Sequence, residues 1–334
     1  MKKIYILWGL LACMALFTSC YEEDTLTPTG GIELRFKVPQ GNNSWDDDIA
    51  QIYEDYNVYL IYKDLQRADF NRSWTGISYG SGYEGQGCVN DEMTNYYVEF
   101  MKKHIFAYLN PPITSKVLPM YWYLGYNVYS KSVLEVGGVI LASWIVPIHE
   151  NYDGLDYWCT CMFGEDNPSD PYLIPTDRAL LDRRRKMILA PVLEKAVKAG
   201  NIIIPEEFEV GFDHVTNLIA GLGMEDDPNY YLTRGYPGSV NTYVFNSISE
   251  PANNSYPPTN EETFIGYMHL SMYYNQARLA EVYPADKYPF LTEKFAFVQK
   301  YLKDKYQIDL EAIANGPEDW DLPLPPIPET PDEE

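Results

Sequence analysis

The sequence is poor in histidine and in basic residues, and both shortages exclude chemistry. Its 334 residues include four histidines, and no histidine or cysteine pair has the spacing of a zinc site. No nucleophile elbow, phosphate-binding loop or dinucleotide-binding fingerprint is present. Lysine and arginine total 25 against 48 aspartates and glutamates, for a formal charge of −23. So acidic a chain disfavours anionic partners and excludes a nucleic-acid-binding role.

The sequence opens with a hydrophobic run, Ile4–Phe17, that is too short to be a typical membrane span. Lys2 and Lys3 precede it and Ser19-Cys20 follows it, which predicts a signal peptide over residues 1–19. A small residue before a cysteine resembles a bacterial lipobox. That motif implies that Cys20 becomes the mature N-terminus and carries the lipid anchor.

An acidic tether comes next. Tyr21-Glu22-Glu23-Asp24 resembles the export signal of Bacteroidota surface lipoproteins, which implies an outer-membrane protein that faces outward. We therefore divide the chain into a signal peptide (1–19), a lipidated cysteine with its tether (20–31), a folded domain (32–312) and a tail (313–334). The tail is rich in proline and acidic residues, a composition typical of disorder.

Three cysteines, Cys88, Cys159 and Cys161, remain after the predicted lipid site. An exported protein can form disulfides. Cys159 and Cys161 are too close in sequence for an easy bridge, so Cys88 with one of them is the candidate pair. The odd number indicates that at least one cysteine is simply buried.

Strand patterns come early in the chain and helix patterns late, which predicts an α+β fold. The predicted strands are 32–38, 57–62, 117–128 and 138–146. The predicted helices are 45–56, 95–109, 177–200, 208–222, 259–283 and 291–306. Residues 69–90, 147–176 and 224–258 are predicted to be loops or irregular segments.

The central helix has clear end signals, with Asp177 as its N-cap and Gly200 as its stop. Pro191 interrupts the pattern and predicts a kink or a second helix there. Residues 183–186 (RRRK) form the one dense basic run. They indicate either a solvated face paired with acidic neighbours or an anion site, and we favour the solvated face.

Several segments together resemble the Bacteroidota surface lipoproteins known as putative zinc-binding metallopeptidases. The matching stretches are residues 45–62, 100–129, 137–146 and 261–310. The resemblance implies a zincin-like domain with a mixed sheet in its N-terminal half and helices in its C-terminal half. In that family a central helix carries His-Glu-x-x-His, which binds zinc and activates water. A later helix supplies a third, carboxylate ligand.

This chain departs from the family at each of those ligand positions. The histidine motif aligns with Ala190-Pro191-Val192-Leu193-Glu194, and the third ligand aligns with Gly266. We therefore expect no metal, no catalytic residue and no cofactor. The alternative is a rebuilt zinc site made from His214, His269 and Glu262. A plain structural role is the simpler interpretation of each histidine.

Aromatic side chains are abundant, with 30 tyrosines and 7 tryptophans. Exposed rings can stack on sugars or peptides, although most rings in a folded protein fill the core. The candidate ligand-binding residues come from the two aromatic loops: Tyr79, Tyr83, Tyr152, Tyr157 and Trp158.

The sequence thus predicts a cell-surface lipoprotein with a decayed metallopeptidase-like domain. Its expected role is non-catalytic: binding a peptide or a glycan, or serving as an accessory protein of a nutrient-uptake system. The alternative function is that of a zinc-dependent metallopeptidase with a rearranged metal site. Its expected partners are the outer membrane, the ligand and the uptake proteins.

Overall fold

The structure, a computed structural model, describes residues 34–72, 81–152, 154–164 and 175–317. The chain divides into residues 1–37 and a compact unit of residues 38–334, to which the helices and strands described below belong. The predicted signal peptide, Cys20 and Tyr79 lie outside the described residues, as does most of the predicted tail. Residues 34–38 form no strand, so the predicted first strand is wrong over that part.

A six-stranded mixed sheet forms the N-terminal half of the unit, and the fold is mixed α/β. Strand β3 is its axis: β1 and β6 run parallel beside its first part, while β2 and β4 run antiparallel beside its second part. The strands are β1 (Tyr59–Ile61), β2 (Gly82–Gln86), β3 (Tyr121–Val136), β4 (Val139–Pro147), β5 (Glu150–Asn151) and β6 (Tyr157–Phe163). The predicted strands 57–62 and 138–146 are confirmed as β1 and β4, whereas the predicted strand 117–128 covers only the first half of β3, which continues to Val136.

Strand β6 corrects the prediction of a loop over residues 147–176. All seven of its residues, YWCTCMF, are buried. A strand buried on both faces shows no polar–apolar alternation, so its sequence lacks the usual strand pattern. Strand β2 likewise lies inside the predicted loop 69–90.

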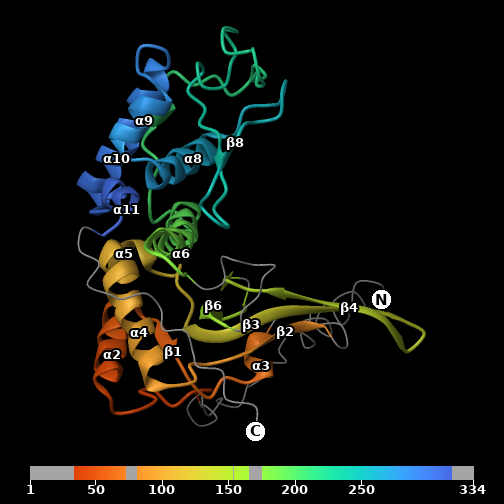
Figure 1. Cartoon of the computed structure of the whole chain (residues 1–334). Coiled ribbons are helices and arrows are strands. Elements are labelled where there is room, and N and C mark those ends of the chain that lie inside the picture. Colours follow the sequence, from red (N-terminus) through yellow and green to blue (C-terminus); the bar gives the residue numbers. More distant parts are fainter. Residues whose placement is uncertain (1–33, 73–80, 153, 165–174, 318–334) are drawn as a thin grey trace, which may run out of the picture. The chain divides into compact units, whose positions relative to one another are not determined.

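Helices pack against one end of the sheet and predominate in the C-terminal half of the unit (Figure 1). They are α2 (Ser44–Tyr56), α3 (Arg67–Phe70), α4 (Asp91–Phe100), α5 (Pro111–Thr114), α6 (Arg178–Lys198), α7 (Glu206–Glu209), α8 (Asn260–Tyr273), α9 (Gln276–Val282), α10 (Pro289–Tyr306) and α11 (Leu310–Asn315). A π-helical turn (Met101–Ile105) and a 3-10 turn (Phe106–Tyr108) extend α4. Helix α6 lies between the sheet with α2, α4 and α5 on one side and α8, α10 and α11 on the other (Figure 1).

Two helix predictions fail in the C-terminal half. The predicted helix 208–222 is mostly irregular, because Gly211, Gly221 and Gly223 all adopt positive φ angles. The predicted helix 259–283 begins as expected, at a capping box between Thr259 and Glu262. It ends early, since Tyr274 is extended, and α9 follows as a separate helix.

The ends of helix α6 are where the sequence predicts them. The Asp177 carboxylate accepts a hydrogen bond from the Leu180 N–H at 2.8 Å, and Gly200 ends the helix with φ of +76°. Pro191 lies inside one continuous helix, so a second helix does not begin there. Proline has no N–H for the carbonyl four residues earlier, which is that of Met187. The Tyr152 hydroxyl lies 3.4 Å from this carbonyl and also 3.4 Å from the Glu150 carboxylate, so its one proton is shared between these two acceptors.

The basic run on α6 is buried, which corrects the prediction of a solvated face. Arg184 is 1%, Arg185 0% and Lys186 8% exposed, because α6 is enclosed by protein on nearly all sides. The prediction that the run pairs with acidic neighbours is confirmed. The Arg184 guanidinium lies 3.4 Å from the Glu150 carboxylate. The Asp182 carboxylate forms ion pairs with Arg185 and Lys186. Burial raises the pKa of Glu150 to about 8, although Arg184 favours its charged form.

The candidate disulfide is not formed. Cys88, Cys159 and Cys161 are all free thiols. Cys159 and Cys161 are fully buried in strand β6, and the Cys88 Sγ donates to the Leu124 carbonyl at 3.7 Å. These cysteines therefore contribute to packing, and burial raises the pKa of each thiol.

Candidate ligand-binding cleft

Helices α6 and α8 contact each other at Ala190 and Glu194 of α6 and at His269 of α8. The resemblance aligns Ala190 and Glu194 with zinc ligands, but its third position falls on Gly266 and not on His269. The His269 Nε2 lies 3.7 Å from the Glu194 Oε2, and His269 also hydrogen-bonds the backbone of Ala190.

The groups at this contact do not fit the zinc site of that family. A zinc ion takes three or four protein ligands, and among the described residues only His269 and Glu194 converge here. The second oxygen of Glu194 is 2.6 Å from the Lys198 ammonium. A side chain at Gly266 would have its Cβ 3.2 Å from Pro237, which leaves little room for a ligand there. Burial lowers the pKa of His269 to about 4, so this histidine is neutral at pH 7.

The alternative metal site of His214, His269 and Glu262 is not assembled. Glu262 and His269 lie seven residues apart on α8, about 10 Å along the helix axis. The Glu262 carboxylate turns toward the helix start, where it accepts from the Thr259 N–H at 2.7 Å and the Thr259 hydroxyl at 2.9 Å. The His214 Nδ1 is hydrogen-bonded to the Pro258 carbonyl oxygen, 2.7 Å away. Within the described ranges, no three His, Cys, Asp or Glu residues form a group that could hold a metal.

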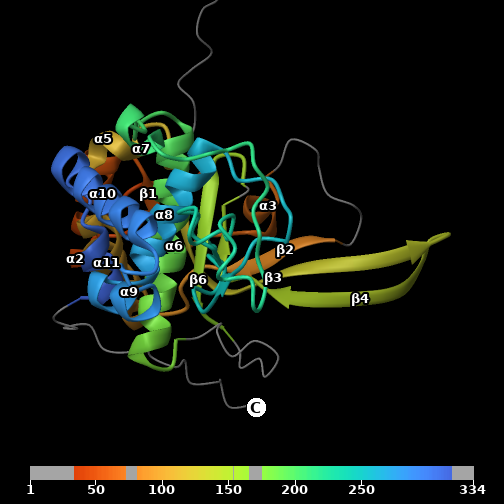
Figure 2. The same ribbon diagram turned by 90° about the horizontal axis from the view of Figure 1, so that it is seen from above.

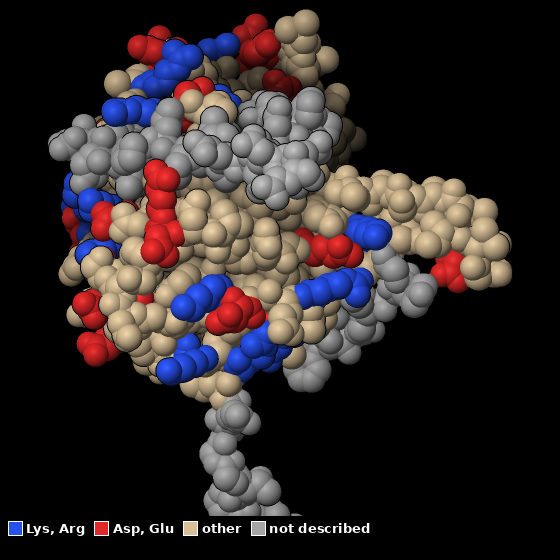
Figure 3. Space-filling model, turned by 60° about the horizontal axis from the view of Figure 1, so that its bottom comes forward, with Lys and Arg blue, Asp and Glu red and all other residues tan. Residues whose placement is uncertain are grey.

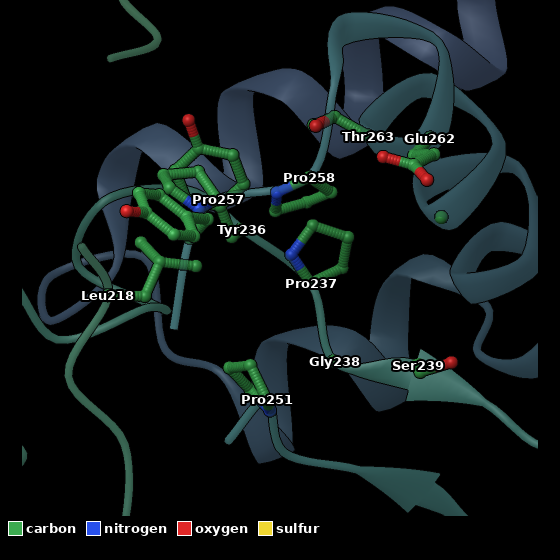
Figure 4. Close-up of a pocket in the computed structure, with 12 residues that line it drawn as sticks. Leu218, Tyr236, Pro237, Gly238, Ser239, Pro251, Pro257, Pro258, Glu262 and Thr263 are labelled. Atoms are coloured by element: carbon green, nitrogen blue, oxygen red, sulfur yellow. The ribbon is translucent and has the colours of Figure 1, made fainter. Parts of the chain in front are cut away.

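A cleft of about 490 Å³ opens over the first turns of α8 (Figure 4). Its walls come from α8 and from the irregular segments that precede this helix, beside β7 (Ser239–Val240) and β8 (Ile248–Ser249). The lining residues are Leu218, Tyr236, Pro237, Gly238, Ser239, Pro251, Tyr256, Pro257, Pro258, Glu262, Thr263 and Gly266. Four prolines and two tyrosines give the cleft a rigid, largely apolar wall, since proline fixes φ.

Hydrogen bonds beneath this wall fix its shape. The Tyr236 hydroxyl donates to the Asp213 carbonyl at 2.8 Å. A carbonyl accepts only, so the contact between His214 Nδ1 and the Pro258 carbonyl requires the proton on Nδ1. His214 is therefore a structural residue here that ties the segment before α8 to the 213–218 turn. The cleft is preformed by these contacts, which lowers the ordering cost of binding a ligand.

The rim of the cleft combines a free aromatic surface with a negative charge. Tyr256 is 83% exposed, and its ring can stack on a ligand. Hydrogen bonds from Thr259 hold the pKa of Glu262 below its ordinary value, so Glu262 is ionised at pH 7. The cleft therefore favours neutral or basic ligands over acidic ones.

The aromatic residues chosen from the sequence lie elsewhere. Tyr157 is 1% and Trp158 4% exposed, and Tyr157 stacks on Tyr123 with ring centres 4.7 Å apart. Tyr152 is half-buried beneath α6 and Tyr83 is half-buried in β2. The rings of Tyr157 and Trp158 cannot form a surface platform, because strand β6 places both of them in the interior. Sequence reasoning missed Tyr236 and Tyr256, whose signal was their position directly before prolines.

Comparisons with known proteins add little. No family model matches the sequence, and no curated protein matches it. A similar solved structure is described as that of a "putative zinc-binding metallo-peptidase" from Bacteroides caccae. It has 13% sequence identity and a TM-score of 0.38, over 82% of this chain and 92% of that chain. Agreement this low does not establish a shared fold.

Proposed function

We propose that this protein is an outer-membrane lipoprotein of the cell surface whose folded unit binds a peptide or a glycan in the α8 cleft without catalysing a reaction. In this proposal the domain is zincin-like and descends from a metallopeptidase. The cleft selects neutral or basic ligands and passes them to, or holds them for, a nutrient-uptake system in the same membrane.

The observation that carries this proposal is the Glu194–Lys198–His269 cluster at the α6–α8 contact. One oxygen of Glu194 is held by Lys198 and the other faces His269. A catalytic zinc needs three protein ligands and an open position for water. A lysine ammonium in this cluster repels a cation instead, which supports loss of the ancestral activity.

The membrane part of the proposal is supported by residues 1–24, which lie outside the described residues. In the part of the chain that the structure describes, no helix is both long and apolar enough to cross a membrane. Metabolic labelling with an alkyne fatty acid tests the anchor. The native chain should take up the label and a Cys20→Ala variant should not, whereas equal labelling would refute lipidation at Cys20.

Ligand binding is tested with the chain from residue 21 onward on glycan and peptide arrays. The Tyr256→Ala variant should weaken binding of any hit by about fivefold or more, because one stacked ring contributes roughly 1–3 kcal/mol. Tyr243, which is 57% exposed and does not line the cleft, gives the matched control Tyr243→Ala. Equal loss in both variants, or loss in neither, would contradict the cleft as the binding site.

The alternative function, a zinc-dependent peptidase with a rearranged site, is tested by metal content. The purified chain is stripped with chelator, reloaded with zinc, and measured by native mass spectrometry. We expect no stoichiometric zinc. One zinc per chain that is lost in a His269→Gln variant would overturn the non-catalytic proposal and would make the α6–α8 contact the metal site.

A further inference from the structure

The second part of β3 and the whole of β4 form a hairpin that projects from the rest of the unit in both views (Figures 1 and 2). Strand β2 pairs with β3 as far as Lys131, and beyond that residue β4 is the strand that pairs with it. The turn is Gly137-Gly138, with φ angles of +61° and +83°. These angles suit glycine and are typical of the tight turns that close twisted hairpins.

This hairpin is apolar and exposed. Eight large apolar side chains on it are 47–61% exposed: Leu134, Val136, Val139, Ile140, Leu141, Trp144, Ile145 and Val146. Over residues 132–147 the one charged residue is Glu135. In the space-filling view, almost all of the visible surface of the projection is neither acidic nor basic (Figure 3).

Both faces of the hairpin carry apolar side chains. Successive residues of a strand point to opposite faces, so Trp144 and Val146 lie on one face and Ile145 on the other. An ordinary half-buried strand would pair apolar residues on one face with polar residues on the other. This hairpin therefore exposes apolar side chains to solvent on both of its faces.

The outer edge of β4 is also open. Among the described residues, β3 is the only strand that pairs with β4. Soluble proteins protect such edges with lysines, prolines or bulges, because an open edge pairs with other strands. Residues 139–146 contain no charge and no proline, and one bulge, at Leu141, is the sole protective feature. This edge is therefore built to accept another strand.

We propose that the β3–β4 hairpin is a self-association surface, through which two copies of this chain pair their β4 edges antiparallel to each other. A two-fold axis between two antiparallel strands makes the same edge complementary to itself. One contact then satisfies the open backbone groups and also brings apolar side chains together. The eight residues 139–146 offer an edge of about 27 Å for this pairing.

A lipid bilayer is the competing occupant, and two features of the hairpin disfavour it. Open N–H and C=O groups on the β4 edge would have no hydrogen-bond partner in hydrocarbon. Glu135 pairs with Ile140 close to the turn, so its charge would enter the membrane first. Pairing with a second copy of the chain avoids both penalties. The second β4 strand supplies hydrogen-bond partners for the open backbone groups, and Glu135 stays in contact with water.

Sedimentation velocity of the chain from residue 21 onward tests the proposal, because this chain contains the whole unit 38–334. The native chain should shift from monomer to dimer as its concentration rises. The variant Leu141→Lys/Ile145→Lys should weaken the dimer at least about tenfold, since like charges opposite each other oppose pairing. The control Val215→Lys/Leu222→Lys changes two exposed apolar residues outside the hairpin, 82% and 97% exposed, and should leave the dimer intact.

Hydrogen exchange gives a second readout that a change in folding would not mimic. Amides of residues 139–146 should exchange more slowly at dimer concentrations than at monomer concentrations, while the core of β6 should not change. A chain that stays monomeric at every concentration overturns the proposal. Flotation with phosphatidylcholine vesicles then distinguishes the reason, because binding that the lysine variant loses would make the bilayer the occupant.

Discussion

Helix α6 and the β3–β4 hairpin are opposites in burial. Charged side chains of α6 lie inside the protein, while apolar side chains of the hairpin are exposed to solvent. Helix α6 buries Arg184, Arg185 and Lys186 at 8% exposure or less, while β4 leaves Ile140 and Ile145 more than half exposed. The cause is position in the fold rather than composition. Helix α6 is enclosed between two layers, so even its polar positions are inside, and the hairpin extends beyond the sheet, so even its apolar positions are outside.

Buried cations and exposed apolar side chains are stabilised by different partners. The α6 cations are satisfied inside the molecule, by Glu150, Asp182 and backbone carbonyls. The hairpin has no such internal partner among the described residues, and in our proposal a second copy of the chain supplies one. On that proposal, the first region governs stability and the second governs association.

The largest expected effect is from breaking the α6 cluster. Arg184→Ala should lower the free energy of unfolding by ~3–5 kcal/mol, because it removes a large, fully buried side chain and leaves the His149 and Cys161 carbonyls without their donor. Urea denaturation measures this value. Arg183→Ala, at a half-buried neighbouring position, is the control and should cost less than ~1 kcal/mol. Equal costs would mean that the buried charge is not a special feature of α6.

A second effect is a pH dependence from Glu150. Its pKa rises from 4.5 in an unfolded chain to about 8 in the folded one, so the folded state binds the proton more tightly. Stability from this group is full below pH 4.5 and declines as the pH rises to about 8. Each pKa unit corresponds to about 1.4 kcal/mol. In Glu150→Gln the decline should vanish, and denaturation curves between pH 5 and 8 check this.

A third effect, of opposite sign, comes from His269. Burial lowers its pKa from 6.5 to about 4, so its stabilising contribution is full above pH 6.5 and is lost as the pH falls toward 4. His269→Gln should remove that loss while keeping the side chain polar. Thermal unfolding at pH 4.5 and pH 7 measures the difference. If native and variant proteins lose equal stability on acidification, His269 is more accessible to water than its position indicates.

The smallest expected effect on stability comes from substitutions in the hairpin. Leu141→Lys/Ile145→Lys in the hairpin should change the unfolding free energy of the monomer by ~0.5 kcal/mol or less, because both side chains are already exposed. The same double change at Ile188 and Leu193 of α6, both fully buried, should prevent folding. A marked loss of monomer stability in the hairpin variant would show that the hairpin packs against its own chain.

Much of the fold could be predicted from local signals. The capping residues Asp177 and Thr259, the stop at Gly200 and the strand patterns of β3 and β4 act through contacts within a few residues. Strand β6 could not be predicted this way, since burial on both faces removes the pattern. The burial of Arg184 and Arg185 depends on residues far away in sequence, which no local pattern reports.

The candidate site was harder to predict than the fold. The resemblance aligned Glu194 and Gly266 with zinc-ligand positions, whereas in the structure the α8 residue that faces Glu194 is His269. The cleft is built from irregular segments between residues 218 and 258, and irregular backbone has no periodicity to detect. The chain has thirty tyrosines, and no local pattern marks those of the cleft. Only the long-range folding of the chain leaves Tyr256 exposed and Tyr157 buried.

The contact between the Tyr152 hydroxyl and the Met187 carbonyl has a consequence for how the chain folds. Pro191 leaves this carbonyl without its helical donor, so an isolated α6 has a gap at its centre. The donor that fills the gap comes from the segment between β5 and β6. Helix and sheet thus complete each other's hydrogen bonds, and we expect them to form in one cooperative step. Stopped-flow refolding of a Tyr152→Phe variant should show slower or less cooperative formation of α6.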